Sequence, residues 1–431
     1  LNARSCGNPG NNEFVKKMRF FRVFPIQNTL FIALKTTRGP KLGILMRTKR
    51  PQFNRYCVRF MSTKSISLEA KSRHTLLESW FYEVHTFGNL ILKSSFDISI
   101  EPLNPEKHPN MNKLFIKLLY TGEPDGLDGS AFSALTKLYQ LDIDIQNEKQ
   151  LVVINGNNKI KAKLPLLCHI QVPIKFGLNL TGEGEANIEV KDLESESITA
   201  QVENGDFYCQ KVRSGQLDIK TKGGNIISKS LMQGNLILRC EGNGMIQTGR
   251  LLGTFFDCTT DQGEIIIQSN YAEKSQFQTR GGNIRLQSCH GSTDVKIQHG
   301  SLIVDTLDGD LKSEIVAGNT NIFIAREGKL DLSCKTGDII LKLPESMNAS
   351  LILLADSITS DDAVDLSTLE ETKCNNQTLL IGELKRSTMK REQDLLPDAV
   401  GRINVKTNKG SIHLEKYDWF ASLQLGQLKE E

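Results

Sequence analysis

The chain of 431 residues contains few sequence motifs that indicate a biochemical activity. Its 9 cysteines include no C-x-x-C pair and show no zinc-ligand spacing. Its paired glycines at 223–224 and 281–282 lack the spacing of a phosphate-binding loop. No apolar run approaches the roughly 18 residues that a membrane-spanning helix requires. We therefore predict no cofactor, no bound metal and no membrane span.

Acidic residues are absent from residues 14–68, which contain 13 Lys or Arg. Of the 53 bases and 50 acids in the chain, 14 bases and 1 acid lie in residues 1–68, which leaves 39 bases and 49 acids for the remainder. Non-specific nucleic-acid binding rests on the neutralisation of phosphates by bases. The negative net charge of residues 69–431 therefore argues against a nucleic-acid partner.

The basic leader, residues 1–68, has the composition of a mitochondrial transit peptide. After Met18, which offers a start besides Leu1, bases are interleaved with apolar and hydroxyl residues and with no acid. Arg59 precedes Ser62 with the spacing of a matrix-peptidase cleavage site. The alternative is a basic arm that binds an acidic surface. The leader thus predicts a mitochondrial protein, located in the matrix, whose cysteines are buried free thiols in a reducing compartment.

Glycine is abundant, with 34 residues against 12 prolines, and it recurs at an even step. Each step is nine or ten residues, except for one double step between Gly263 and Gly282. The repeat glycines are Gly205, Gly215, Gly224, Gly234, Gly244, Gly253, Gly263, Gly282, Gly291, Gly300, Gly309, Gly318, Gly328 and Gly337. Asn, Asp, Lys, Ser or Glu flank nearly all of them, which is typical of turns.

Two positions after most of these glycines stands an apolar residue, as in Leu217, Leu236 and Phe255, and Thr293 and Thr320 fill the same place in two repeats. Four positions after the glycine the apolar residue returns. Alternation with period two predicts a strand with one buried face. Each repeat therefore contains one short strand and one turn.

The even step favours a parallel β-solenoid (β-helix) over an antiparallel meander, because stacked coils need similar lengths to keep their inward residues aligned. The number of strands per coil and the handedness stay open. We predict an all-β protein in which a leader, 1–68, precedes an irregular N-terminal β cap, 69–180. The regular repeats, 181–344, and a region with an insertion loop, the last repeat and a C-terminal cap, 345–431, follow.

Four segments in this order resemble a known family: VPIKFGLNLTGEGEANIEV, QVENGDFYCQKVRSGQLDIKTKGGNI, LPESMNASLILLADSITSD and TNKGSIHL. Together they are similar to the putative-adhesin family of β-strand repeats, whose function is unknown. The basic leader and acidic body are similar to those of its animal, mitochondrial-type members. The resemblance covers roughly residues 84–418. It implies a parallel β-solenoid and transfers no catalytic residue.

Carbohydrate-active hydrolases and lyases also use parallel β-helices, and they need two or three converging carboxylates. One candidate set is Asp305, Asp308 and Asp310, although turn chemistry already explains the last two, which flank Gly309. The other set, in the insertion, is Asp361, Asp362 and Asp365.

His290 and His299 each precede a corner glycine. If stacked coils bring them together, they offer two metal ligands, but two ligands alone make no site.

The function that we predict is a non-catalytic interaction or scaffold protein that binds protein partners, whose identity the sequence leaves open, as it does the oligomeric state. The alternative is a β-helix hydrolase or lyase that uses Asp305, Asp308 and Asp310. Outward residues of the strands would form the interaction surface. They include Asp218, Arg285, Lys296, Lys312, Asn321 and Asp331.

Overall fold

The computed structural model describes residues 74–123, 129–160, 162–344, 347–374, 376–384 and 401–417, and four strands within the leader. These strands form an antiparallel sheet in the order β1-β2-β3-β4. Their bounds are Val23–Ile26, Thr29–Lys35, Leu42–Met46 and Cys57–Arg59. Arg59 thus ends β4, whereas Ser62 lies outside the described residues, so the cleavage site stays a prediction.

The rest of the described chain is β-structure with one helix, α1 (Gly129–Leu135). The strands of the N-terminal part are β5 (Thr75–Glu83), β6 (Asn89–Ser94), β7 (Asp97–Pro102), β8 (Lys113–Tyr120), β9 (Tyr139–Gln146), β10 (Leu151–Asn158), β11 (Leu166–Val172), β12 (Gly177–Gly182) and β13 (Ile188–Lys191). The strands of the central part are β14 (Glu194–Val202), β15 (Phe207–Gln210), β16 (Val212–Thr221), β17 (Ile226–Cys240), β18 (Ile246–Thr260), β19 (Ile265–Gly281), β20 (Ile284–His299) and β21 (Leu302–Ala317). The C-terminal strands are β22 (Thr320–Ile324), β23 (Lys329–Thr336), β24 (Ile339–Leu343), β25 (Ala349–Ala355), β26 (Ser357–Ser360), β27 (Leu366–Cys374), β28 (Gln377–Leu384), β29 (Gly401–Thr407) and β30 (Ser411–Lys416).

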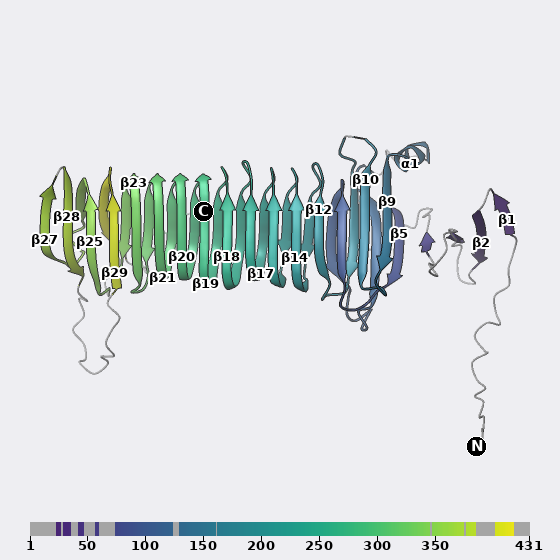
Figure 1. The fold of residues 1–431 in the computed structure, drawn as a ribbon, viewed down its shortest axis with the longest axis horizontal. Coiled ribbons are helices and arrows are strands. Elements are labelled where there is room, and N and C mark those ends of the chain that lie inside the picture. Colours follow the sequence, from purple (N-terminus) through teal and green to yellow (C-terminus); the bar gives the residue numbers. More distant parts are fainter. Residues whose placement is uncertain are drawn as a thin grey trace, which may run out of the picture.

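From β12 to β24 the strands pair in parallel with partners one coil further along the chain. Leu217 faces Leu236, Ile226 faces Ile246, and Ile284 faces Leu302, so that one coil is 18 to 20 residues. A coil therefore contains two of the nine- or ten-residue steps seen in the sequence. Figure 1 shows the resulting row of strands side by side along the length of the molecule.

The strands form two rows that share the long strands β17–β21. The first row is β5-β8-β11-β7-β13-β15, the first halves of β17–β21, and β22-β24-β30-β26. The second row is β9-β10-β6-β12-β14-β16, the second halves of β17–β21, and β23-β29-β25-β28-β27. Both rows end in open edges, so the sheet does not close on itself.

At each end of the stack one coil is inserted out of sequence order. Strands β6 and β7 lie between the coil β10–β11 and the coil β12–β13. Likewise β29 and β30 lie between β23–β24 and β25–β26. Antiparallel pairs complete both ends, including the hairpin β9–β10, whose turn residues Asn147 and Glu148 have positive φ.

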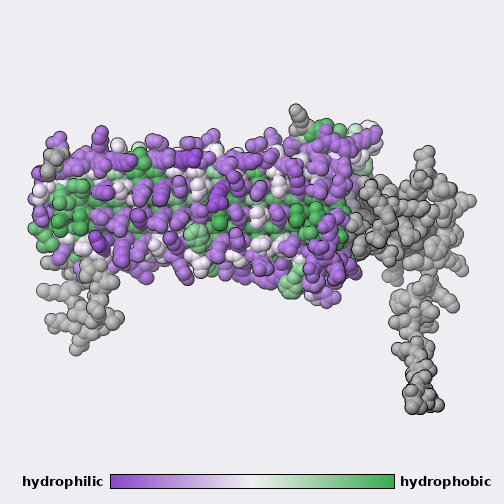
Figure 2. All heavy atoms as spheres, viewed as in Figure 1, coloured by the Kyte–Doolittle hydropathy of each residue, from purple (hydrophilic) through white to green (hydrophobic). Residues whose placement is uncertain are grey.

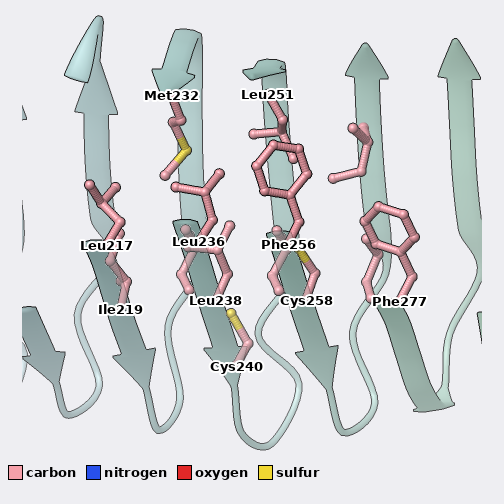
Figure 3. Packing of buried hydrophobic residues seen from close by; sticks show 14 of the residues in the cluster. Leu217, Ile219, Met232, Leu236, Leu238, Cys240, Leu251, Phe256, Cys258 and Phe277 are labelled. Atoms are coloured by element: carbon pink, nitrogen blue, oxygen red, sulfur yellow. The ribbon is translucent and has the colours of Figure 1, made fainter. Parts of the chain in front are cut away.

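Inward side chains of successive coils form one continuous hydrophobic core. Figure 3 shows these side chains lined up from strand to strand, with Leu217, Leu236 and Phe256 in neighbouring coils. Thr293 and Thr320 are buried in their slots, as predicted. Phe255 is not: the neighbouring Phe256 is buried instead. The pairing of β17 with β18 shifts register just before this point, and the extra residue in β18 turns Phe255 out of the core.

Candidate functional site

The repeat glycines form two columns, one at each corner of the coil. A Cβ on any of these glycines would overlap a backbone carbonyl oxygen of the preceding coil, so the close stacking of the coils at these positions depends on glycine. The first column is Gly205, Gly224, Gly244, Gly263, Gly282, Gly300, Gly318, Gly337 and Gly410. The second is Gly215, Gly234, Gly253, Gly291, Gly309 and Gly328. Ala272, paired with Gly253, occupies the position where the sequence step doubles.

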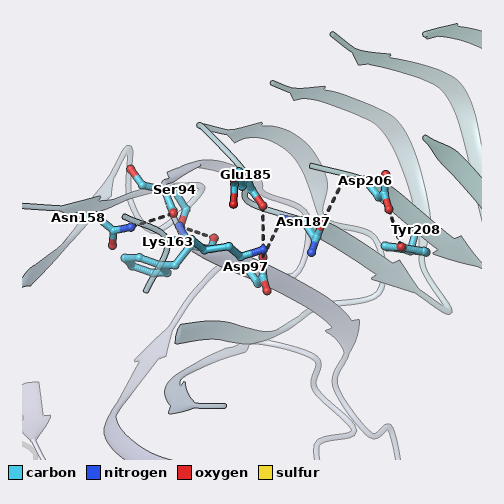
Figure 4. Close-up of polar contacts among 10 residues, drawn as sticks. Ser94, Asp97, Asn158, Lys163, Glu185, Asn187, Asp206 and Tyr208 are labelled. Carbon is cyan, nitrogen blue, oxygen red and sulfur yellow. Dashed lines mark hydrogen bonds and ion pairs between the residues drawn. The ribbon is translucent and has the colours of Figure 1, made fainter. Parts of the chain in front are cut away.

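Asn and Asp residues that follow first-column glycines bond to the next coil. The side-chain oxygen of Asp206 accepts the N–H of Asn225 at 2.8 Å, and that of Asn225 accepts the N–H of Met245 at 3.0 Å. Figure 4 shows the start of this ladder, where Asp97 accepts from Asn187. The turn residues therefore hold successive coils in register.

Tyr208 and Lys163 support this ladder from its sides (Figure 4). The Tyr208 hydroxyl donates to Asp206 at 2.7 Å, and this hydrogen bond, with partial burial, raises the pKa of Tyr208 to about 12. Lys163 forms an ion pair with Asp97 at 2.9 Å and donates to the carbonyl oxygen of Glu185. All these groups have structural partners within the stack, which leaves no poised acid or base among them.

Asp338 closes the ladder at the C-terminal end and gives it a pH dependence. Its carboxylate accepts the N–H and the hydroxyl of Ser411, each at 2.8 Å, and these bonds lower the pKa of Asp338. Because the folded pKa is the lower one, the bonds stabilise the fold above the ordinary Asp pKa of about 4, and this stability is lost as the pH falls through the lowered pKa.

We therefore expect the variant Asp338→Asn to be less stable than the unsubstituted chain at pH 7, with a difference that shrinks as the pH falls below the ordinary Asp pKa of about 4. Urea midpoints measured across this range check it. Asp362→Asn, at an exposed position, is the matched control. A midpoint difference that stays constant with pH would contradict the assignment.

The three carboxylates proposed for catalysis each have a structural partner. Arg285 donates to Asp305 through Nε at 3.1 Å and Nη2 at 2.9 Å. Asp308 lies 3.2 Å from His290 Nδ1 and 3.4 Å from Arg326. Asp310 accepts the N–H of Lys329 at 2.8 Å. They support neighbouring coils and do not converge on a common point as an acid and base pair would.

The second acidic set does not form a site either. Asp361 lies 3.4 Å from His413 Nε2, while Asp362 and Asp365 are exposed. Within the described ranges, no group of three His, Cys, Asp or Glu residues could hold a metal ion.

Stacking of the coils does not bring His290 and His299 together. One coil contains two glycine steps, so the two residues lie at different corners of the same coil. His290 faces Asp308 and His299 faces Ala317 in the next coil. The His290 ring instead stacks on Tyr271, with centroids 4.4 Å apart.

Six cysteines have described side chains, and all are buried and free, as predicted: Cys168, Cys209, Cys240, Cys258, Cys289 and Cys334. Burial raises the pKa of Cys168 and of Cys209 to about 12, and that of Cys240 to about 11. The thiolate is the reactive form, so these thiols are inert in the folded protein.

We expect the folded chain, with Cys6, Cys57 and Cys374 replaced by serine, to show almost no reaction with the thiol reagent DTNB at pH 8. In guanidinium chloride all six remaining thiols should react at once, because unfolding restores their ordinary pKa of about 8.5. Absorbance of the released thiolate reports the count. Rapid reaction of any thiol in the native protein would place it outside the core.

The outer face of the second row carries a groove of about 510 Å³ over β19–β21, β23 and β29. Four lysines and two carboxylates are among its lining residues: Lys296, Lys312, Lys335, Lys406, Glu314 and Asp331. A smaller hollow of about 160 Å³ adjoins it at β18–β21. Of the outward residues that we singled out from the sequence, Lys296, Lys312 and Asp331 line this groove, while Arg285 and Asn321 lie on the first row.

An outward apolar patch lies next to the groove, on β25 and β28. Ile352 faces Ile381 and Leu354 faces Leu379 across this antiparallel pair. Figure 2 shows hydrophobic residues gathered at this end of the molecule, beside a mostly hydrophilic middle. The sequence pattern did not indicate the patch, because residues 345–431 read as an insertion loop, the last repeat and a C-terminal cap. The run LILL, apolar on both faces of a strand, was the available signal.

Residues 140–390 match the family model described as Toastrack DUF4097. This chain belongs to that family. The matched residues include the patch on β25 and β28 and all residues that line the second-row groove except Asn404 and Lys406 on β29.

Among solved structures, this Toastrack chain is similar to a putative adhesin from Parabacteroides distasonis ATCC 8503. The two are 14% identical over 62% of this chain and 96% of that one, with a TM-score of 0.36. A putative adhesin from Parabacteroides merdae ATCC 43184 is 15% identical over 63% and 96%, with a TM-score of 0.33. A putative lipid binding protein from P. distasonis ATCC 8503 is 9% identical over 80% and 98%, with a TM-score of 0.29. In the described part of the chain, no helix has the length and apolar character needed to cross a membrane.

Proposed function

We propose that this Toastrack chain is a non-catalytic scaffold that binds protein partners through the outer face of its second row. The observation that carries the proposal is the groove over β19–β21, β23 and β29 with the apolar patch directly beside it. Interaction surfaces combine an apolar core with charged groups at the rim. The carboxylates suggested for hydrolysis or lysis, by contrast, are bound to Arg285, His290, Arg326 and the backbone of Lys329.

The finer architecture in this proposal is a parallel β-solenoid with two strands per coil. Its support is the 18-to-20-residue register, the two glycine columns and the Asn and Asp ladder between coils. A solenoid of this kind is a stiff support, because each coil is fixed to both neighbours along its length. Partners would bind a preformed surface and pay little ordering entropy.

Chemical cross-linking of the full chain in its own cells, followed by mass spectrometry, tests the scaffold proposal. We expect reproducible partner proteins whose cross-links map to second-row lysines such as Lys312 and Lys335, and the same partners with Asp305→Asn. Cross-links that are spread equally over both rows, or partners lost with Asp305→Asn, would contradict it. The absence of any reproducible partner would do so too.

The location that we propose for this scaffold is the mitochondrial matrix, on the support of the acid-free residues 14–68 and the spacing of Arg59 and Ser62. Sequencing the N-terminus of the mature protein tests it. A mature chain that begins near Ser62 agrees with import and cleavage. A mature chain that retains residues 18–60 contradicts it.

A further inference from the structure

We infer that the groove and the patch form one docking surface for an extended segment of a protein partner, with acidic residues at one end and apolar residues at the other. The inference rests on the proposed scaffold function and gives the chemistry of the partner. The docking surface consists of Lys296, Lys312, Lys335, Lys406, and the patch Ile352, Leu354, Leu379 and Ile381.

Strand register makes the two parts continuous. Lys406 of β29 faces Ser333 of β23 on one side and Leu354 of β25 on the other. Leu354 in turn faces Leu379 of β28. Across these neighbouring strands, the lysine part of the docking surface is therefore followed directly by its leucine part.

The groove is positive on a body that is negative. Its lining has four lysines and two carboxylates, whereas residues 69–431 have 39 bases and 49 acids. One of the carboxylates, Glu314, lies 3.8 Å from Lys312, and the other, Asp331, accepts a hydrogen bond from Asn404 at 3.2 Å. Lys296, Lys335 and Lys406 have no carboxylate within ion-pair distance among the described residues. An occupant that complements this positive charge must therefore carry acidic residues.

The dimensions give the length of the occupant. The surface runs over six strands, β20, β21, β23, β29, β25 and β28. Five spacings of about 4.8 Å give roughly 24 Å, which an extended segment covers with about seven residues. The groove, of about 510 Å³, has room for side chains to enter it, whereas a flat bilayer surface would contact only its rim. These features favour a peptide segment over a membrane.

The test uses a fluorescein-labelled peptide of about eight residues, alternating Asp and Glu in the first half and alternating Val and Leu in the second. Fluorescence anisotropy measures its binding to the full chain. Lys406→Glu, in the docking surface, is matched with Lys229→Glu, an exposed lysine of β17 outside the docking surface. The double variant Ile352→Ser with Ile381→Ser tests the apolar half.

We expect the peptide to bind the unsubstituted chain and Lys229→Glu equally, and Lys406→Glu and the double Ser variant at least about tenfold more weakly. A peptide with the same composition in scrambled order should bind weakly as well. No binding to the unsubstituted chain, or equal loss with both lysine variants, overturns the inference. Binding of phosphatidylserine vesicles that depends on Lys406 overturns it in favour of a membrane surface. If cross-linking still recovers second-row partners, the scaffold function survives and only this docking chemistry fails.

Discussion

Replacing Gly224 with alanine is expected to lower the free energy of unfolding by about 3 kcal/mol, at the upper end of the usual cost of overpacking. The new Cβ would overlap the carbonyl oxygen of Gly205 in the preceding coil. That oxygen belongs to backbone rather than to a mobile side chain. Gly224 is itself fixed, because its carbonyl oxygen accepts the buried Thr221 hydroxyl at 2.6 Å.

The neighbouring Gly223 supplies the matched control. It is exposed, and a Cβ there would have as its nearest atom Oδ1 of Asn204, at 3.1 Å, on an exposed side chain that can move. We expect Gly223→Ala to change stability by only about 0.5 kcal/mol. Denaturant unfolding followed by circular dichroism measures both variants. Equal effects at 223 and 224 would contradict the stacking argument.

A substitution in the first glycine column tests the stacking argument more directly than a substitution in the second column. The second column already accepts a methyl group at Ala272, which is 6% exposed and faces Gly253. Substitutions in the second column thus have a natural precedent within the chain. In the first column every position from Gly205 to Gly337 is glycine.

Strand positions were readable from the sequence because alternation shows directly which residues face inward. Leu217, Leu236 and Ile284 are all fully buried, as predicted. Parallel pairing between 205 and 341 agrees with the even step. The exception, Phe255, depends on a single extra residue at a corner, which no local pattern reveals.

The number of steps per coil could not be read from the period, because both corners of the coil use the same residue. This ambiguity left open whether His290 and His299 meet, as they would in a coil of one step; in the structure they do not. The double step at Ala272 was the one sign that the glycines form two separate sets. The chemistry of the candidate carboxylates likewise depended on partners such as Arg326, 18 residues from Asp308 in sequence.

The order of coils at the ends depends on long-range pairing and had no local signature. The sequence shows only that the glycine phrase returns as KGSIHL after an interval. It does not show that β29 and β30 lie between two coils that precede them in the chain. The docking surface depends on this order, because it is β29 that brings Lys406 next to Leu354.

Deleting residues 401–431 is therefore expected to unfold the C-terminal end of the stack rather than shorten it by one coil. The deletion removes Ile403, Val405, Ile412 and Leu414, which are all at most 1% exposed. At about 2 kcal/mol for each buried side chain, the loss is about 8 kcal/mol, comparable with the whole stability of an ordinary domain. Strands β25 and β26 would lose their parallel partners as well.

Deleting only residues 418–431 is the control, since it keeps both strands and Tyr417, whose ring packs on Phe323 with centroids 4.4 Å apart. Hydrogen exchange followed by mass spectrometry distinguishes the outcomes. We expect the longer deletion to lose protection in β23–β28 while β14–β18 keep theirs, because coils contact only their neighbours. Unchanged protection in β25 would contradict this expectation, because it would mean that β25 keeps its structure without its partner β29.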